Sequence, residues 1–105
     1  MRKLNIGVAG LGRAFALMAP TLAADARVAL VAAADPRAEA RKRFSEEFSS
    51  PAYTTVEELC ADPVVDVVYV ATPHEMHAAH ACLAASRGKQ HLQSPPEYAA
   101  LEKSA

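Results

Sequence analysis

The sequence has little of several features that would indicate a specialised class of protein. It contains no tryptophan and only two cysteines, Cys60 and Cys82, which are not in metal-ligand spacing. A disulfide-rich scaffold is therefore excluded, and reduced thiols of a cytoplasmic protein are expected. No apolar run approaches the roughly 18 residues of a membrane-spanning helix. The apolar run over residues 4–12 is also too short for a secretory signal.

An excess of charge of either sign is also absent. The chain carries 11 lysines and arginines against 12 aspartates and glutamates, a formal net charge of −1 with histidine neutral. This balance provides no basic surface to attract nucleic acid or an anionic membrane. The composition therefore predicts one cytoplasmic globular domain over residues 1–105, with neither nucleic acid nor membrane as a partner.

Apolar runs and helical segments alternate as they do in a parallel sheet. The predicted strands are Leu4–Ala9, Val28–Ala34, Ala52–Thr54, Val64–Ala71 and Gln90–Gln93. The predicted helices are Arg13–Ala24, Arg37–Phe48, Val56–Ala61, Glu75–Ser86 and Pro95–Ser104. Together they predict an α/β fold: a Rossmann-type, doubly wound parallel sheet of five or six strands in the order 3-2-1-4-5.

Local signals mark the ends of several helices. Pro20 is expected to bend or end the first helix, because proline removes a helical hydrogen bond. Pro36 is expected in the first turn of the second helix, where a missing N–H costs nothing. Thr55 and Glu58 have the spacing of a capping box. Gly88 is placed to end the helix that precedes it.

The strongest chemical signal joins the first strand to the first helix. Residues 8–15 read Val-Ala-Gly-Leu-Gly-Arg-Ala-Phe. The first glycine permits a tight turn, and the second removes a side chain that would block the phosphates of a dinucleotide at the start of the helix. The residues predicted here to bind the cofactor are Gly10, Leu11, Gly12, Arg13 and Ala14.

The third glycine of the G-x-G-x-x-G pattern is replaced by Phe15. That glycine normally keeps the strand and the helix close together. Ala14 and Ala16 could provide the close approach instead, or the helix could lie further from the sheet. Arg13 could reach a phosphate or could remain a free surface charge.

Asp35 ends the second strand, where an acidic side chain can accept both hydroxyls of the adenosine ribose. Alternatively, it only caps the helix that follows. A carboxylate there would repel the 2′-phosphate of NADP by on the order of 1 kcal/mol in water and about 4 kcal/mol at an effective dielectric constant of 20. The expected cofactor is therefore NAD rather than NADP. Arg37 is also a candidate cofactor residue that could offset the repulsion, although a solvated helix charge is the favoured interpretation.

Three segments, Leu4–Arg13, Ala34–Arg37 and Val68–His77, together resemble the N-terminal domain of the Gfo/Idh/MocA oxidoreductases. The resemblance runs from about residue 4 to residue 88. Its most specific part, Ala-Thr-Pro-His-Glu-Met-His at residues 71–77, is similar to the family's ATP-x-x-x-H segment. The opening resembles the branch that oxidises dihydrodiols of phthalate-like aromatic acids. The resemblance implies that four further residues line the ribose and nicotinamide side of the site: Ala71, Thr72, Pro73 and His77.

The sequence departs from this family towards its end. Members usually carry Glu-Lys-Pro, whose lysine acts near the reacting carbon, whereas Ser94 and Pro95 stand at the glutamate and lysine positions here. Residues 91–105 are expected to form an atypical tail, and the family's C-terminal substrate domain is expected to be absent. Removing that domain would expose the strand around Val67–Val70 and the edge near His91 and Leu92, which predicts a homo-oligomer.

These observations predict the dinucleotide-binding domain of an NAD-dependent oxidoreductase that transfers hydride at a hydroxyl-bearing carbon, in a chain that is catalytically incomplete. A stand-alone, non-enzymatic NAD(H)-binding or sensing module is the main alternative. A methyltransferase is a second alternative, because its glycine loop and acidic strand end are similar. The glycine spacing and the Thr72-Pro73 loop favour the dinucleotide.

The remaining polar residues are expected to be solvated. Three histidines follow one another at intervals of three, at positions 74, 77 and 80. A helical zinc pair needs histidines four residues apart, so no metal site is predicted. Lys89 and the arginines at positions 37, 41 and 43 are expected to lie in solvent.

Overall fold

A computed structural model describes residues 3–72 and 76–93, apart from the side chains of His77 and Gln93. These residues form a five-stranded sheet in the order β3-β2-β1-β4-β5, with every neighbouring pair parallel. The predicted Rossmann-type α/β fold and strand order are confirmed. The strands are β1 (Leu4–Ala9), β2 (Val28–Ala34), β3 (Ala52–Tyr53), β4 (Val67–Val70) and β5 (Gln90–Gln93).

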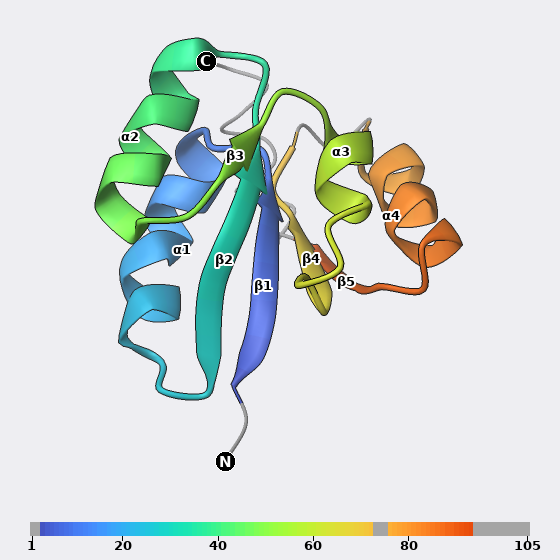
Figure 1. Cartoon of the computed structure of the whole chain (residues 1–105), viewed down its shortest axis with the longest axis horizontal. Coiled ribbons are helices and arrows are strands. Elements are labelled where there is room, and N and C mark those ends of the chain that lie inside the picture. Colours follow the sequence, from blue (N-terminus) through green and yellow to red (C-terminus); the bar gives the residue numbers. More distant parts are fainter. Residues whose placement is uncertain (1–2, 73–75, 94–105) are drawn as a thin grey trace.

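Two helices cover each face of the sheet (Figure 1). The first pair, α1 (Arg13–Ala24) and α2 (Ala38–Phe48), packs on one face. The second pair, α3 (Val56–Cys60) and α4 (His77–Ser86), packs on the other. Because side chains alternate along a strand, each strand contributes to both cores. In β1, Val8 belongs to the first core and Ala9 to the second.

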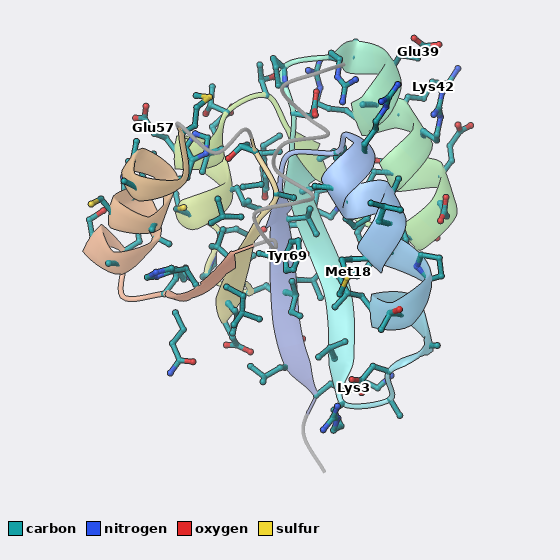
Figure 2. The ribbon with its side chains drawn as sticks, turned by 180° about the vertical axis from the view of Figure 1, so that it is seen from behind. Lys3, Met18, Glu39, Lys42, Glu57 and Tyr69 are labelled. Carbon is teal, nitrogen blue, oxygen red and sulfur yellow. The ribbon has the colours of Figure 1, made fainter. Side chains whose placement is uncertain are left out.

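Aromatic packing holds α1 and α2 to the first face. The ring centroids of Phe15 and Phe44 lie 6.2 Å apart, in an edge-to-face arrangement that aromatic pairs favour. Figure 2 shows Met18 of α1 pointing towards the sheet and Glu39 and Lys42 of α2 pointing away from it. The helix α2 is therefore amphipathic, as its spacing predicts.

Close backbone packing holds α3 to the second face. A Cβ atom on Gly7 of β1 would lie 2.8 Å from Leu59 Cδ1 of α3, so a larger residue there would force the Leu59 side chain to shift. The predicted capping box at the start of α3 is confirmed: Thr55 Oγ1 accepts the Glu58 N–H at 3.2 Å, and Glu58 Oε1 accepts the Thr55 N–H at 3.1 Å.

One prediction about proline needs correction. The first helix has its predicted bounds, Arg13–Ala24, and Pro20 lies inside it, so of the two expected effects, bending or ending the helix, Pro20 does not end it. Pro20 lacks a backbone N–H, so the helix loses one hydrogen bond, but Pro20 lies on the exposed side. Leu22, later in the helix, still packs against the core. Pro36 is not in the first turn of the second helix, because Arg37 is the N-cap and α2 begins at Ala38.

Other boundaries shift where side chains hold a turn. The strand predicted from Val64 begins at Val67, because Asp62 Oδ1 accepts the Val64 N–H at 2.9 Å and holds the preceding residues in a turn. Two further elements end one residue earlier than predicted: β3 at Tyr53 and α3 at Cys60. The helix α4 begins at His77, and the predicted start at Glu75 lies outside the described residues.

The expected exposure of β4 is wrong, since Val67, Val68, Tyr69 and Val70 are all buried. Leu92 of β5 is 52% exposed, so the predicted apolar edge remains in part. Gly88, with a φ of 74°, follows the C-cap of α4 as predicted. The helix predicted over residues 95–104 lies outside the described residues. Among the described helices, none is long and apolar enough to span a bilayer.

The same substitution at two leucines tests the packing of the second face. Leu59 is fully buried, whereas Leu17 of α1 is 49% exposed. Leu59→Ala is expected to lower the free energy of unfolding by about 2–5 kcal/mol, because it leaves a cavity. Leu17→Ala should change it by less than about 0.5 kcal/mol. Urea denaturation measures both, and similar losses for the two variants would contradict this packing.

Candidate functional site

The carboxyl ends of β1, β2 and β4 meet at one edge of the sheet, the upper edge in Figure 1. A cleft of about 420 Å³ opens there, within the range of ligand pockets. Open parallel sheets bind ligands at this edge, where the connections diverge to opposite faces. The cleft is lined by Gly10, Gly12, Ala34, Asp35, Pro36, Arg37, Thr54, Val56, Ala71, Thr72, Met76 and His80.

Gly10 turns the chain from β1 into the glycine loop. Its φ is 95°, a conformation that favours glycine. A Cβ atom there would lie 2.9 Å from Thr72 Cγ2 and 3.1 Å from the Ala71 carbonyl oxygen. Glycine is therefore needed both for the turn and for the close contact with the end of β4.

The start of α1 has the features of an anion site. Its N-cap is Gly12, so no side chain caps the first turn. A helix start of this kind presents backbone N–H groups and the positive end of the helix dipole to a phosphate. Of the two alanines that could replace the third glycine, Ala14 is fully buried in the first core and Ala16 is exposed.

Asp35 is the most heavily hydrogen-bonded side chain of the cleft, and it is only 5% exposed. Its Oδ2 accepts the Leu11 N–H at 2.9 Å, and its Oδ1 accepts the Arg37 N–H at 2.8 Å. The Arg37 guanidinium donates to both oxygens, at 3.0 and 3.1 Å. Burial alone would raise the pKa of Asp35. The hydrogen bonds from Arg37 and Leu11 oppose it and hold that pKa below its ordinary value.

The arginines near Asp35 are not simply solvated, which corrects the favoured interpretation. Arg37 forms an ion pair with Asp35 while its side chain stays 61% exposed. Arg41 donates to the carbonyl oxygens of Asp35 and Pro36, both at 2.9 Å. Arg43 is exposed, as predicted. Arg37 and Arg41 can both reach Asp35 because Asp35 lies in the turn that directly precedes α2.

A second buried polar side chain lies across the cleft. His80 of α4 is 7% exposed, and its Nδ1 lies 2.7 Å from Thr72 Oγ1. Which of the two atoms donates depends on the tautomer of the imidazole. The predictions from sequence place Thr72 in the site but leave His80 out.

The structure brings together six of the predicted residues as cleft lining: Gly10, Gly12, Asp35, Arg37, Ala71 and Thr72. Leu11, Arg13 and Ala14 belong to the loop but do not line the cleft. Arg13 is exposed. Pro73 lies outside the described residues, and so does the side chain of His77.

Sequence reasoning missed several lining residues, although a signal exists for some of them. Thr54 and Val56 follow β3, and parallel strands bring their carboxyl ends to one edge. Met76 and His80 are four residues apart, and so lie on one side of the start of α4. Only the helical spacing points to these two.

A somewhat larger groove, about 470 Å³, lies between α1 and α2. Its lining is mostly alanine, proline, leucine and phenylalanine, with Arg43 and Glu47 as the charged residues. It lacks a buried polar side chain, so we place the site in the smaller cleft.

Two further polar predictions can be compared with the structure. Lys89 is not simply in solvent, because its Nζ donates to the Asp62 carbonyl oxygen at 2.9 Å. This bond ties the start of β5 to the end of α3. Within residues 3–72 and 76–93, no group of three or more histidine, cysteine, aspartate or glutamate side chains could hold a metal ion.

Comparison with known families agrees with this geometry. The family model of the Gfo/Idh/MocA oxidoreductases, described as having an NAD-binding Rossmann fold, matches residues 4–102. The chain belongs to this family. It carries the family's NAD(P)-binding domain, and the match includes residues 91–102 of the tail that was expected to be atypical.

Similar proteins are dehydrogenases and a reductase. The chain is 45% identical over 100 residues to 1-carboxy-3-chloro-3,4-dihydroxycyclo hexa-1,5-diene dehydrogenase of Comamonas testosteroni, covering 94% of this chain and 25% of that protein. It is 42% identical over 72 residues to trans-1,2-dihydrobenzene-1,2-diol dehydrogenase of Mus musculus, covering 67% and 21%.

Among solved structures, KijD10, a 3-ketoreductase from Actinomadura kijaniata in complex with NADP and TDP-benzene, superposes with a TM-score of 0.83 at 26% identity. The alignment covers 98% of this chain and 35% of that one. The chain therefore spans about a quarter of the length of the two dehydrogenases and about a third of this reductase.

The hydrogen bonds of Asp35 predict a pH dependence of stability. Because its folded-state pKa lies below the ordinary 3.8, ionised Asp35 stabilises the fold above that pH, and the contribution is lost as the pH falls through the folded-state value. Asp35→Asn should therefore lower the free energy of unfolding at pH 6. The difference in this free energy between variant and wild type should become smaller towards pH 3. Glu46→Gln, an exposed change on α2, is the control. A gap independent of pH, in chemical denaturation, would contradict the assignment.

Proposed function

We propose that the cleft binds a nicotinamide dinucleotide, with the pyrophosphate on the glycine loop and the adenosine ribose beside Asp35. The observation that carries this proposal is the convergence of an uncapped helix start, a glycine in close contact with the end of β4, and a buried carboxylate. The backbone N–H groups of Arg13 and Ala14 would face the phosphates. Ala71, Thr72, Pro73 and His77 would border the nicotinamide half.

The cofactor, when bound, supplies hydride transfer. The residues of this chain bind and orient it. Gly10 and Gly12 let the backbone approach the phosphates, and Asp35 fixes Leu11 and with it the conformation of the loop. The groups named in the cleft do not include a general acid or base placed against a substrate.

We infer that the whole protein oxidises a hydroxyl-bearing carbon to a carbonyl, or carries out the reverse reduction, with a cyclic diol as the favoured substrate class. Support comes from the names of the two dehydrogenases, both of which act on dihydroxylated rings. Ser94 and Pro95, at the positions of the family's glutamate and lysine, favour a second candidate function. That candidate is a non-enzymatic module that binds or senses NAD(H).

The chain alone is expected to show no dehydrogenase turnover. With Pro95 at the position of the family's lysine, general acid–base catalysis is lost, which typically costs about 10²–10⁴-fold in rate. Purified chain is to be assayed for NADH production with cyclohexadiene diols and polyols. Robust turnover in a preparation free of other dehydrogenases would contradict an incomplete site. Restoring turnover by Pro95→Lys would show that the lysine is the missing part.

We propose that the cleft binds NAD more tightly than NADP. The difference in affinity is smaller than a carboxylate without a neighbouring cation would give. Asp35 would repel a 2′-phosphate, but Arg37 lies within 3.0 Å of its Oδ1 and offsets part of that repulsion. The four hydrogen bonds that Asp35 accepts also occupy its lone pairs. Ribose hydroxyls would therefore have to displace the Arg37 guanidinium from the carboxylate.

Calorimetric titration tests this proposal with two opposite changes. Wild type is expected to bind NADH about fivefold more tightly than NADPH, the effect of about 1 kcal/mol of screened repulsion. Asp35→Ser should narrow the difference in affinity between NADH and NADPH. Arg37→Ala should widen this difference, because the substitution frees the carboxylate for the ribose and removes a cation from the 2′-phosphate. Arg43→Ala, on the exposed side of α2, should leave it unchanged.

Tighter binding of NADPH by the wild type would overturn the preference for NAD. S-adenosylmethionine is included as a third ligand and is expected not to bind. Binding of S-adenosylmethionine in place of either dinucleotide would overturn the proposed function itself and favour the methyltransferase alternative.

We also propose a cytoplasmic homo-oligomer. The thiols of Cys60 and Cys82 are both free, as expected in a reducing compartment. Self-association would use the edge of β5, where exposed Leu92 adjoins an unpaired strand edge among the described residues.

Sedimentation at micromolar concentration tests the assembly. The wild type is expected to sediment as a dimer or larger species, and Leu92→Lys, which places a charge on the edge strand, should shift it towards the monomer. Leu17→Lys, an exposed leucine on α1, serves as the control. A clean 11.1 kDa monomer for the wild type would contradict the proposal.

A further inference from the structure

The described residues contain two buried polar or charged side chains, Asp35 and His80, and both line the cleft. Asp35 already has a place in the proposed function. His80 has none, although it is 93% buried on a helix whose other buried side chains, among those described, are Ala81 and Ala84. Burying an imidazole costs free energy unless its nitrogens are hydrogen-bonded. Its contact with Thr72 is therefore the feature to explain.

The side chain of Thr72 makes contacts on two sides. Its Oγ1 lies 2.7 Å from His80 Nδ1. Its Cγ2 lies 2.9 Å from the point where a Cβ atom of Gly10 would be. Because Oγ1 and Cγ2 share one χ1 angle, the hydrogen bond to His80 selects the rotamer that places the methyl group against Gly10.

The glycine loop is thus held from two neighbouring strands. On the β2 side, Asp35 accepts the Leu11 N–H at 2.9 Å. On the β4 side, Thr72 packs against Gly10, and His80 fixes Thr72. The chain of contacts links α4, on one face of the sheet, to the loop that begins α1 on the other (Figure 1).

We propose that His80 is a positioning residue of the dinucleotide site, which acts through Thr72 to hold the glycine loop in the conformation that receives the pyrophosphate. This inference rests on the proposed function. Without His80, Thr72 can turn to another rotamer and its methyl group leaves Gly10. The loop then samples conformations in which its N–H groups diverge, and dinucleotide affinity falls.

The test is a set of variants titrated with NADH. His80→Leu removes both ring nitrogens, and Thr72→Val removes the hydroxyl but keeps the branched shape. Each is expected to weaken NADH binding about three- to tenfold, the range that loss of one hydrogen bond gives. The double variant should bind no more weakly than the weaker single variant, because both changes break the same contact.

Two further variants separate positioning from other roles. His80→Asn, whose side-chain amide can lie near the position of Nδ1, should recover most of the affinity. Thr72→Ser keeps the hydroxyl and loses the methyl group, so it should weaken binding if the contact with Gly10 matters. A hydroxyl that only touched the ligand would make Thr72→Ser harmless. His91→Leu, on an exposed residue of β5, is the matched control and should bind as the wild type does.

Thermal unfolding without ligand identifies variants that fail to fold, and if His80→Leu is one of them, His80→Asn and the two Thr72 variants carry the test. Wild-type affinity in His80→Leu and Thr72→Val, additive losses in the double variant, or a harmless Thr72→Ser would each overturn the inference and leave the proposed function intact. Failure of the wild type to bind NADH would overturn both.

Discussion

The hydrogen bond from the Leu11 N–H to the Asp35 carboxylate is the contact on which the arrangement of the cleft depends. It joins the loop after β1 to the end of β2, at the point where the chain leaves the sheet for α1. The same carboxylate accepts the Arg37 N–H and so fixes the turn that precedes α2. One buried side chain thereby sets the directions of two helices, which is why a charge can be maintained at a position that is only 5% exposed.

The two faces of the sheet contribute differently to this edge. On the face of α1 and α2, bulky aromatic side chains fill the space, and Phe15 occupies the position where a third glycine would bring helix and strand together. Ala14, fully buried, belongs to the same core. On the face of α3 and α4, small side chains and Gly7 let the helices lie close to the strands. The glycine pattern can thus tolerate Phe15, because the ring points between two helices and not into the cleft.

Strand order, the main strands and the helices follow from the sequence because each rests on a local property. An apolar run as long as one strand is unfavourable in water and has to be buried. Where such runs alternate with helices, a parallel sheet covered by helices buries them. Capping at Thr55 and the turn at Gly88 are equally local. The differences arise at boundaries that side chains or turn geometry decide. Asp62 accepts the Val64 N–H and so delays the start of β4 to Val67, and Arg37, not Pro36, directly precedes α2.

The site could be predicted in part for the same reason. The glycines and Asp35 form a pattern along the chain, but the pairing of Arg37 with Asp35 depends on the turn geometry, and the burial of His80 depends on how α4 packs. A charged residue on a helical segment is usually solvated, so no sequence rule distinguishes Arg37 and Arg41 from Arg43. The spacing of the histidines at positions 74, 77 and 80 does not show which of them faces a ligand. Only the fold shows that His80 lines the cleft.

The exposure of the Asp35–Arg37 pair decides what it can do. An ion pair whose guanidinium is 61% exposed contributes little, about 0–1 kcal/mol, because solvent screens it. In the proposed binding mode, the ribose hydroxyls would replace this exposed guanidinium at small cost. The backbone N–H groups of Leu11 and Arg37 would stay bonded to the carboxylate and keep the loop and the following turn in place. The backbone bonds would then preserve the shape of the site, while the side-chain bonds of Arg37 would be exchanged for those of the ligand.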